Sequence, residues 1–162
     1  MGMGVVAAVL VVATEFMAIA TVDVAGGSCE VIQDTDPELA DRCELSGLER
    51  NGGAFLLIAV LILVMAWGAG FGGSRPAALA LMVAGALVLG WALLVDLPVT
   101  DETGALGRNF EGAEGAAGPG LTVEIVGGAL ALAAGLVALL APQRQPSPPQ
   151  RQPSPKFQGG DA

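Results

Sequence analysis

The sequence contains no histidine and no tyrosine, and it has only one lysine (Lys156) and two cysteines. These absences exclude a Ser-His-Asp triad, a zinc site built on histidine and a phosphate-binding loop with its lysine. Seven basic residues stand against 16 acidic ones, for a net charge of −9, and this balance disfavours binding to nucleic acid. We therefore predict that the protein is not an enzyme and that it uses no metal and no cofactor.

Charge is scarce along most of the chain, and the apolar residues gather in long runs. Charged residues make up 14% of the sequence and hydrophobic ones 53%. About 20 residues of helix cross the roughly 30 Å hydrocarbon layer of a bilayer. We predict an all-α, multi-pass integral membrane protein in which residues 1–141 form a bundle of four transmembrane helices, at residues 3–22, 53–71, 76–95 and 121–141.

An even number of spans places both termini on the same side of the membrane. The short turn between the second and third runs and the C-terminal segment together hold four basic residues, whereas the long loops hold Arg42, Arg50 and Arg108. Because basic residues favour the cytoplasmic side, we predict cytoplasmic termini in a cell (plasma) membrane. A secretory signal peptide is the alternative for the first run, but no basic residue precedes its apolar stretch, and Glu15 interrupts it.

The first long loop, predicted to be extracytoplasmic, contains both cysteines. A bond between Cys29 and Cys43 would close a loop of 15 residues and stabilise the fold by about 3 kcal/mol in an oxidising space. We predict this disulfide, with free thiols or a redox pair as the alternatives, although the C-x-x-C spacing of redox sites is absent. Asp36 and Pro37 predict the start of a short loop helix that ends near Gly47. The acidic residues of this loop predict a solvated surface, with weak binding of divalent cations as the alternative.

Three carboxyl groups lie within or beside the apolar runs: Glu15, Asp96 and Glu124. An ionised side chain near the bilayer centre costs about 2.5–3.5 kcal/mol on insertion scales, so such residues face protein and are candidates for function. Small residues on the helix faces of Glu15 and Glu124 let helix backbones approach closely. We predict helix packing through these positions: Gly4, Ala8, Gly127, Gly128, Ala131 and Gly135.

The sequence leaves three interpretations of these carboxyl groups open. In the first, Glu15 is protonated and forms a hydrogen bond with a neighbouring helix. In the second, Glu15 and Glu124, with Asp96 beside them, are steps of a proton or cation path. In the third, one of the two glutamates pairs with Arg50 or Arg108.

The C-terminal segment, residues 142–162, contains the heptapeptide Pro-Gln-Arg-Gln-Pro-Ser-Pro twice in succession. Such a density of proline excludes a helix and predicts a disordered cytoplasmic tail. For the whole chain we predict a non-enzymatic structural or accessory membrane component, which meets a second copy or another membrane protein through its Gly/Ala helix faces. The alternative is a small proton-coupled transporter or channel that uses Glu15 and Glu124.

Overall fold

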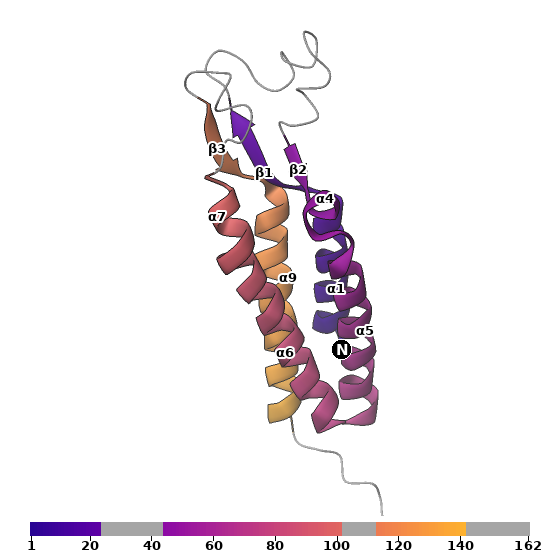
Figure 1. The fold of residues 1–162 in the computed structure, drawn as a ribbon. Helices are drawn as coiled ribbons and strands as arrows, with labels where there is room; N and C mark the ends of the chain where they lie inside the picture. Colours follow the sequence, from indigo (N-terminus) through magenta and orange to yellow (C-terminus); the bar gives the residue numbers. More distant parts are fainter. Residues whose placement is uncertain (24–43, 102–112, 142–162) are drawn as a thin grey trace, which may run out of the picture.

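The computed structural model describes residues 1–23, 44–101 and 113–141. In this part of the chain four helices lie side by side, and a small three-stranded sheet covers one end of them, which we call the sheet end (Figure 1). The described chain is mostly helical, which confirms the all-α prediction in part, and the small sheet departs from it.

The first half of the bundle consists of two long helices and one short one. Helix α1 (Gly2–Glu15) runs toward the sheet end. The short helix α4 (Gly47–Asn51) lies at that end and leads into α5 (Ala54–Gly72), which runs away from the sheet.

The second half returns to the sheet and leaves it again. Helix α6 (Arg75–Trp91) continues through a π turn, η1 (Ala92–Asp96), into α7 (Leu97–Val99) at the sheet end. Helix α9 (Pro119–Leu140) then runs back beside α6. Within the described residues, three helical segments are long and apolar enough to cross a membrane: Ala54–Gly72, Arg75–Val99 and Pro119–Leu140.

The prediction of a continuous helix over residues 3–22 was wrong. Helix α1 ends at Glu15, and its 14 residues rise about 21 Å, short of the roughly 30 Å hydrocarbon layer. The remainder of this apolar run forms strand β1 (Ala18–Asp23), which is rich in β-branched side chains such as Ile19 and Val22. Pairing of this strand with strands that are distant in the sequence therefore outweighs the helical preference of the run.

Proline explains the irregular end of the third long helix, which consists of α6, η1 and α7. Pro98 has no N–H to donate to the carbonyl of Leu94, and its ring crowds that carbonyl. The backbone widens into η1, where the N–H of Leu97 donates to the carbonyl of Ala92, five residues earlier. The helix continues beyond residue 95, where the sequence predicts its end, and Asp96 consequently lies inside the helix.

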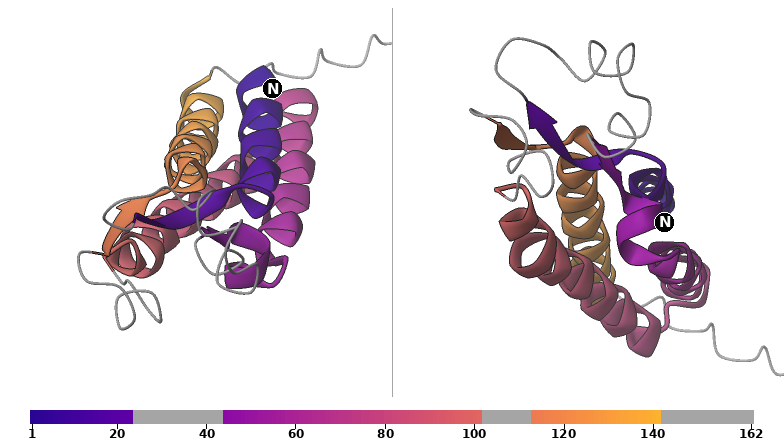
Figure 2. Two further views of the ribbon diagram at one scale, coloured as in Figure 1. Left: turned by 90° about the horizontal axis from the view of Figure 1, so that it is seen from above. Right: turned by 45° about the horizontal axis from the view of Figure 1, so that its top comes forward.

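The sheet joins three segments that are far apart in the sequence. Strand β1 is central and pairs in antiparallel fashion with β2 (Glu44–Ser46) and with β3 (Glu114–Ala117). Seen from above, β1 runs from the end of α1 across the ends of the helices (Figure 2). The N–H of Gly118 donates to the carbonyl of Ile19 at 2.7 Å, so the start of α9 is bonded directly to the central strand.

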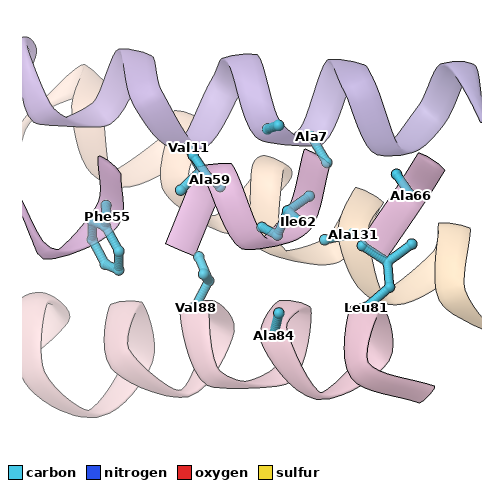
Figure 3. Packing of buried hydrophobic residues seen from close by; sticks show 11 residues of the cluster. Ala7, Val11, Phe55, Ala59, Ile62, Ala66, Leu81, Ala84, Val88 and Ala131 are labelled. Carbon is cyan, nitrogen blue, oxygen red and sulfur yellow. The ribbon is translucent and has the colours of Figure 1, made fainter. Parts of the chain in front are cut away.

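Small side chains fill the centre of the bundle. Helix α1 packs against α5 and α9, and α6 packs against the same two helices, so that the four enclose one core. Alanine is the most frequent residue in this core, and a few larger side chains fill the spaces between helices (Figure 3): Ala7, Ala59, Ala66, Ala84 and Ala131, with Val11, Phe55, Ile62, Leu81 and Val88.

Large apolar side chains lie on the outside of the same helices. Leu57 on α5 is 76% exposed and Leu94 in η1 is 79% exposed, whereas Ala131 in the core is fully buried. Trp67 and Trp91 are also exposed, and they lie near opposite ends of the bundle. The bundle therefore carries its small residues inside and many of its leucines, valines and tryptophans outside.

Three predictions concern residues outside the described part of the chain: the disulfide between Cys29 and Cys43, the start of a loop helix at Asp36 and the tail of residues 142–162. They stay predictions. The predicted end of the loop helix at Gly47 was wrong, because residues 44–46 form β2 and Gly47 begins α4.

Candidate functional site

Three carboxylic side chains converge at the sheet end of the bundle. Glu15 is the last residue of α1, Asp96 is the last residue of η1, and Glu124 lies near the start of α9. All three are fully buried, and Glu124 is within electrostatic reach of both other carboxyl groups. The structure thus brings the three predicted candidates into one place, which we call the carboxyl cluster (Glu15, Asp96 and Glu124).

Glu15 caps a neighbouring helix. Its Oε1 accepts a hydrogen bond of 2.8 Å from the backbone N–H of Phe55, in the first turn of α5. The first N–H groups of a helix have no partner within the helix and lie at the positive end of its dipole, so a carboxylate is stabilised there. Because Glu15 is the acceptor, this bond does not require the side chain to carry a proton.

Asp96 pairs with the arginine of the short helix α4. Arg50 Nε donates to Asp96 Oδ1 at 3.4 Å; the arginine side chain is 33% exposed and the aspartate is fully buried. Arg50 thus forms its ion pair with Asp96, whereas the third interpretation of the sequence pairs it with Glu15 or Glu124. The other predicted arginine, Arg108, lies outside the described residues.

Local sequence fixes α4 in position to present Arg50. Ser46 and Glu49 form a capping box, in which the N–H of Glu49 donates to Ser46 Oγ and the N–H of Ser46 donates to Glu49 Oε2. Trp91 Nε1 donates to Asn51 Oδ1 at 3.1 Å, which adds a second polar contact between α4 and the third long helix. A π turn brings residues five positions apart to the same side of a helix. Trp91, just before η1, and Asp96, at its end, are such residues, and both contact α4.

Glu124 has no comparable partner within the described part of the chain. Neither of its carboxyl oxygens has a hydrogen bond there, and Asp96 Oδ2 also lacks one. Helix α9 packs against η1, and the carboxyl groups of Glu124 and Asp96 lie within electrostatic reach of each other. Two buried carboxyl groups can form a hydrogen bond with each other only if one of them carries a proton, because an ionised carboxylate has acceptors and no donor.

The predicted packing residues lie on surfaces between helices. A side chain at Gly127 would meet Leu10 and Val11 of α1, and one at Gly135 would lie 2.7 Å from the backbone of Met82 on α6. Gly128 also faces α6, and Gly4 faces α5 through Ala66, while Ala8 and Ala131 are buried in the core. The sequence analysis missed Gly85 of α6, where an added Cβ would lie 2.7 Å from the carbonyl oxygen of Gly128.

The interior is polar only at the sheet end. Across residues 1–23, 44–101 and 113–141, the buried polar side chains are Thr14, Glu15, Asp96, Thr100 and Glu124. The Thr14 hydroxyl is satisfied by the carbonyl of Val11, at 2.7 Å. In the same residues, no group of three or more potential ligands is placed to hold a metal ion. The contacts of the cluster are a helix cap, at Glu15, and an ion pair, at Asp96.

Comparison with known proteins adds no family to this description. No protein-family model, no curated protein and no solved structure matches the chain.

Proposed function

We propose that the protein is a multi-pass integral membrane protein that serves as a non-enzymatic structural or accessory component. The distribution of side-chain sizes supports the membrane location. In water, burial of large apolar side chains drives folding, and an exposed apolar surface of this extent is rare on soluble monomers. In lipid, helices instead associate through small residues and leave leucine and valine to the acyl chains. The bundle shows the arrangement expected in lipid, with Ala131 buried and Leu57 and Val137 exposed.

The proposed topology places the sheet end outside the cytoplasm. The turn at Gly73 and the end of α9 lie at the opposite end of the bundle from the sheet. Basic residues are four on that side, in the turn and the tail, and three on the sheet side. The bias favours cytoplasmic termini, and it places the segment with Cys29 and Cys43 in an oxidising space, where a disulfide would form.

The observation that carries the accessory function is the confinement of polar groups to one end of the bundle. Glu15 caps α5, and Asp96 binds Arg50, so two of the three acids hold parts of the fold together. From Val11 and Val88 to the far end, the described core is apolar and lined by alanine, leucine and isoleucine. A transport path across the bundle would need polar groups or a water-filled cavity along its length.

A proton-coupled transporter or channel is the second candidate, and one observation favours it. Glu124 is fully buried, and neither of its oxygens has a hydrogen-bonding partner within the described residues. Buried ionisable groups of this kind occur in proton relays of pumps and transporters.

A flux measurement separates the two candidates. The purified protein is reconstituted into vesicles that contain a pH-sensitive dye, and a pH gradient is imposed. The accessory function predicts proton flux equal to that of empty vesicles for wild type. Flux above that level that is lost in Glu124→Gln, and kept in the exposed control Glu114→Gln, would establish the transporter in its place.

The accessory function also needs a direct test, because absence of flux alone supports it weakly. Crosslinking in intact membranes should capture the chain with a second copy or with another membrane protein. A change from Gly90, where an added Cβ would meet nothing within 4 Å, to Leu on α6 should reduce capture if that side of the bundle is the contact. Recovery of the wild-type chain as a monomer without any crosslinked partner would contradict the accessory function.

A further inference from the structure

The carboxyl cluster contains one more acid than the described residues around it neutralise. The positive end of α5 faces Glu15 through the N–H of Phe55, and Arg50 faces Asp96. Glu124 lies beyond the first turn of α9, and among the described residues its charged neighbours are two acids, Asp96 and Glu15. An isolated buried carboxylate costs several kcal/mol, so a third negative charge at this position is strongly disfavoured.

The other elements packed around Glu124 supply no compensating charge. Helix α5 contains no ionisable residue, and α6 has only Arg75, at its far end. Helix α9 itself has no ionisable residue besides Glu124. The end of β1 beside α9 is apolar, since its only ionisable residue, Asp23, pairs with Glu114 at the other end of the strand.

We propose that Glu124 and Asp96 form a proton-binding carboxyl pair that joins α9 to the third long helix. One proton on Glu124 is donated to Asp96 Oδ2, and Arg50 neutralises the charge that stays on Asp96. A single proton then satisfies two buried groups that otherwise lack partners, one oxygen of Glu124 and Oδ2 of Asp96. The ligand of this site is the proton itself, because a single hydrogen bond between the two carboxyl groups occupies an unpaired oxygen of each.

The π turn is the structural device that builds the pair. By accommodating Pro98, η1 places Asp96 inside the helix and opposite α9, instead of at a solvated helix end. π turns within α-helices are frequent at functional sites. The same turn sets Asp96 against Arg50, so proton binding and the attachment of α4 depend on one side chain.

The pair has a defined consequence for stability. The folded protein holds one proton at neutral pH that the unfolded chain, with an ordinary glutamate, does not hold. Because the folded state then binds more protons, stability falls as the pH rises, and the unfolding equilibrium constant rises by up to about tenfold per pH unit. The proposal does not depend on the accessory function, because it concerns a proton held within the fold, with or without flux.

Infrared difference spectroscopy of the whole protein in detergent tests the pair directly. Wild type should show the C=O stretching band of one protonated carboxyl group at neutral pH, and the band should disappear at alkaline pH. It should be lost in Glu124→Gln and shifted in Asp96→Asn, because the partner of the proton changes. The control Glu114→Gln, at an exposed position of β3, should keep it. Absence of the band in wild type, or its persistence in Glu124→Gln, would overturn the proposal.

A second measurement covers the case in which Glu124→Gln fails to fold. Unfolding of wild type at neutral pH in weakly buffered solution should release one proton, and release of none would overturn the proposal. The same unfolding, repeated in sodium and in potassium or choline salts, tests a cation as the occupant. A sodium-dependent rise of the unfolding temperature would also overturn the assignment to a proton. The flux assay above is independent of both results, so failure of the pair and failure of the accessory function are distinguishable.

Discussion

The last residue of α1 caps the first turn of α5: Glu15 Oε1 lies 2.8 Å from the backbone nitrogen of Phe55. This bond joins two helices through residues that are 40 positions apart in the sequence. It explains why a carboxyl group in an apolar run is tolerated, because the positive end of α5 replaces the water that burial removes. It also coincides with the place where the chain leaves the helical conformation and turns into β1.

Removal of this cap should destabilise the fold. We expect Glu15→Ala to lower the free energy of unfolding by about 1–3 kcal/mol, because it leaves a buried N–H without a partner. Glu15→Gln should cost less, because its amide oxygen can still accept the bond. Equilibrium unfolding in detergent micelles measures both. Glu44→Ala, at an exposed position of β2, is the control and should stay within about 0.5 kcal/mol of wild type; an equal loss in the control would contradict the capping role.

Loss of Arg50 should leave the buried charge of Asp96 without a compensating positive charge. Removal of one partner of a fully buried ion pair costs about 3–5 kcal/mol, and the exposed third of Arg50 reduces this figure. We expect about 1–2 kcal/mol for Arg50→Gln, again from unfolding in micelles. Arg75→Gln, at the other end of the bundle, should be neutral.

A double-mutant cycle decides whether the two side chains act on each other. If they do, Arg50→Gln should cost clearly less in the background of Asp96→Asn, where no charge is left to neutralise. Equal costs in both backgrounds would show that Arg50 stabilises α4 by packing alone.

Disruption of the capping box of α4 should change the environment of the Trp91 side chain. Ser46→Ala removes the acceptor for the N–H of Glu49, at a cost of about 1 kcal/mol, and loosens the helix that holds Asn51 against Trp91. In a Trp67→Phe background, in which Trp91 is the only tryptophan, we expect a shift of the fluorescence emission.

The matched control for this prediction is another serine cap. Ser74 caps α6 at the opposite end of the bundle, where its Oγ accepts from the N–H of Ala77. Ser74→Ala should cost a similar free energy and leave the emission of Trp91 unchanged. An identical shift in both variants would mean that Trp91 reports general loosening of the bundle.

The positions of the long helices were largely predictable because they follow from composition. The predicted runs of residues 53–71 and 121–141 lie within two residues of α5 and α9 at each end. In lipid, the backbone of an unbroken apolar stretch finds its hydrogen-bonding partners only within a helix. In the proposed membrane location, the local sequence signal and the structure therefore agree. The third long helix extends further than predicted. The charge of Asp96 predicts a helix end there, whereas the π turn places Asp96 inside the helix.

The sheet could not be predicted from local sequence. Strand β2 has three residues and β3 has four, and their conformation depends on pairing with a distant segment. Strand β1 lies in the same apolar run as α1, and although Glu15 stands at the boundary, no proline or glycine there indicates a change from helix to strand. The pattern Ser46-x-x-Glu49 is a capping-box signal for the start of α4, and in the structure it outweighs the glycine signal for a helix end at Gly47.

The candidate site was predictable in its members and not in its connections. The cost of burying a charge identifies Glu15, Asp96 and Glu124 from the sequence. The partner of Glu15 is a backbone N–H, a group that every residue except proline carries, so no side chain at position 55 could reveal it. One of the three interpretations of the sequence pairs a glutamate with Arg50 or Arg108, whereas the structure pairs Arg50 with Asp96 beside the π turn.

Close packing between α6 and α9 should be the least tolerant feature of the bundle. An added Cβ at Gly85 would lie 2.7 Å from the carbonyl oxygen of Gly128 and 2.9 Å from Leu132 Cα, both of which are backbone atoms that cannot move independently. We therefore expect Gly85→Ala to destabilise the protein by about 1–3 kcal/mol in micelles. Gly90→Ala is the matched control on the same helix: nothing lies within 4 Å of its added Cβ, and alanine favours helix over glycine, so stability should be unchanged or rise by up to about 1 kcal/mol. Equal tolerance of alanine at both positions would show that α6 and α9 are further apart in the folded protein than this packing requires.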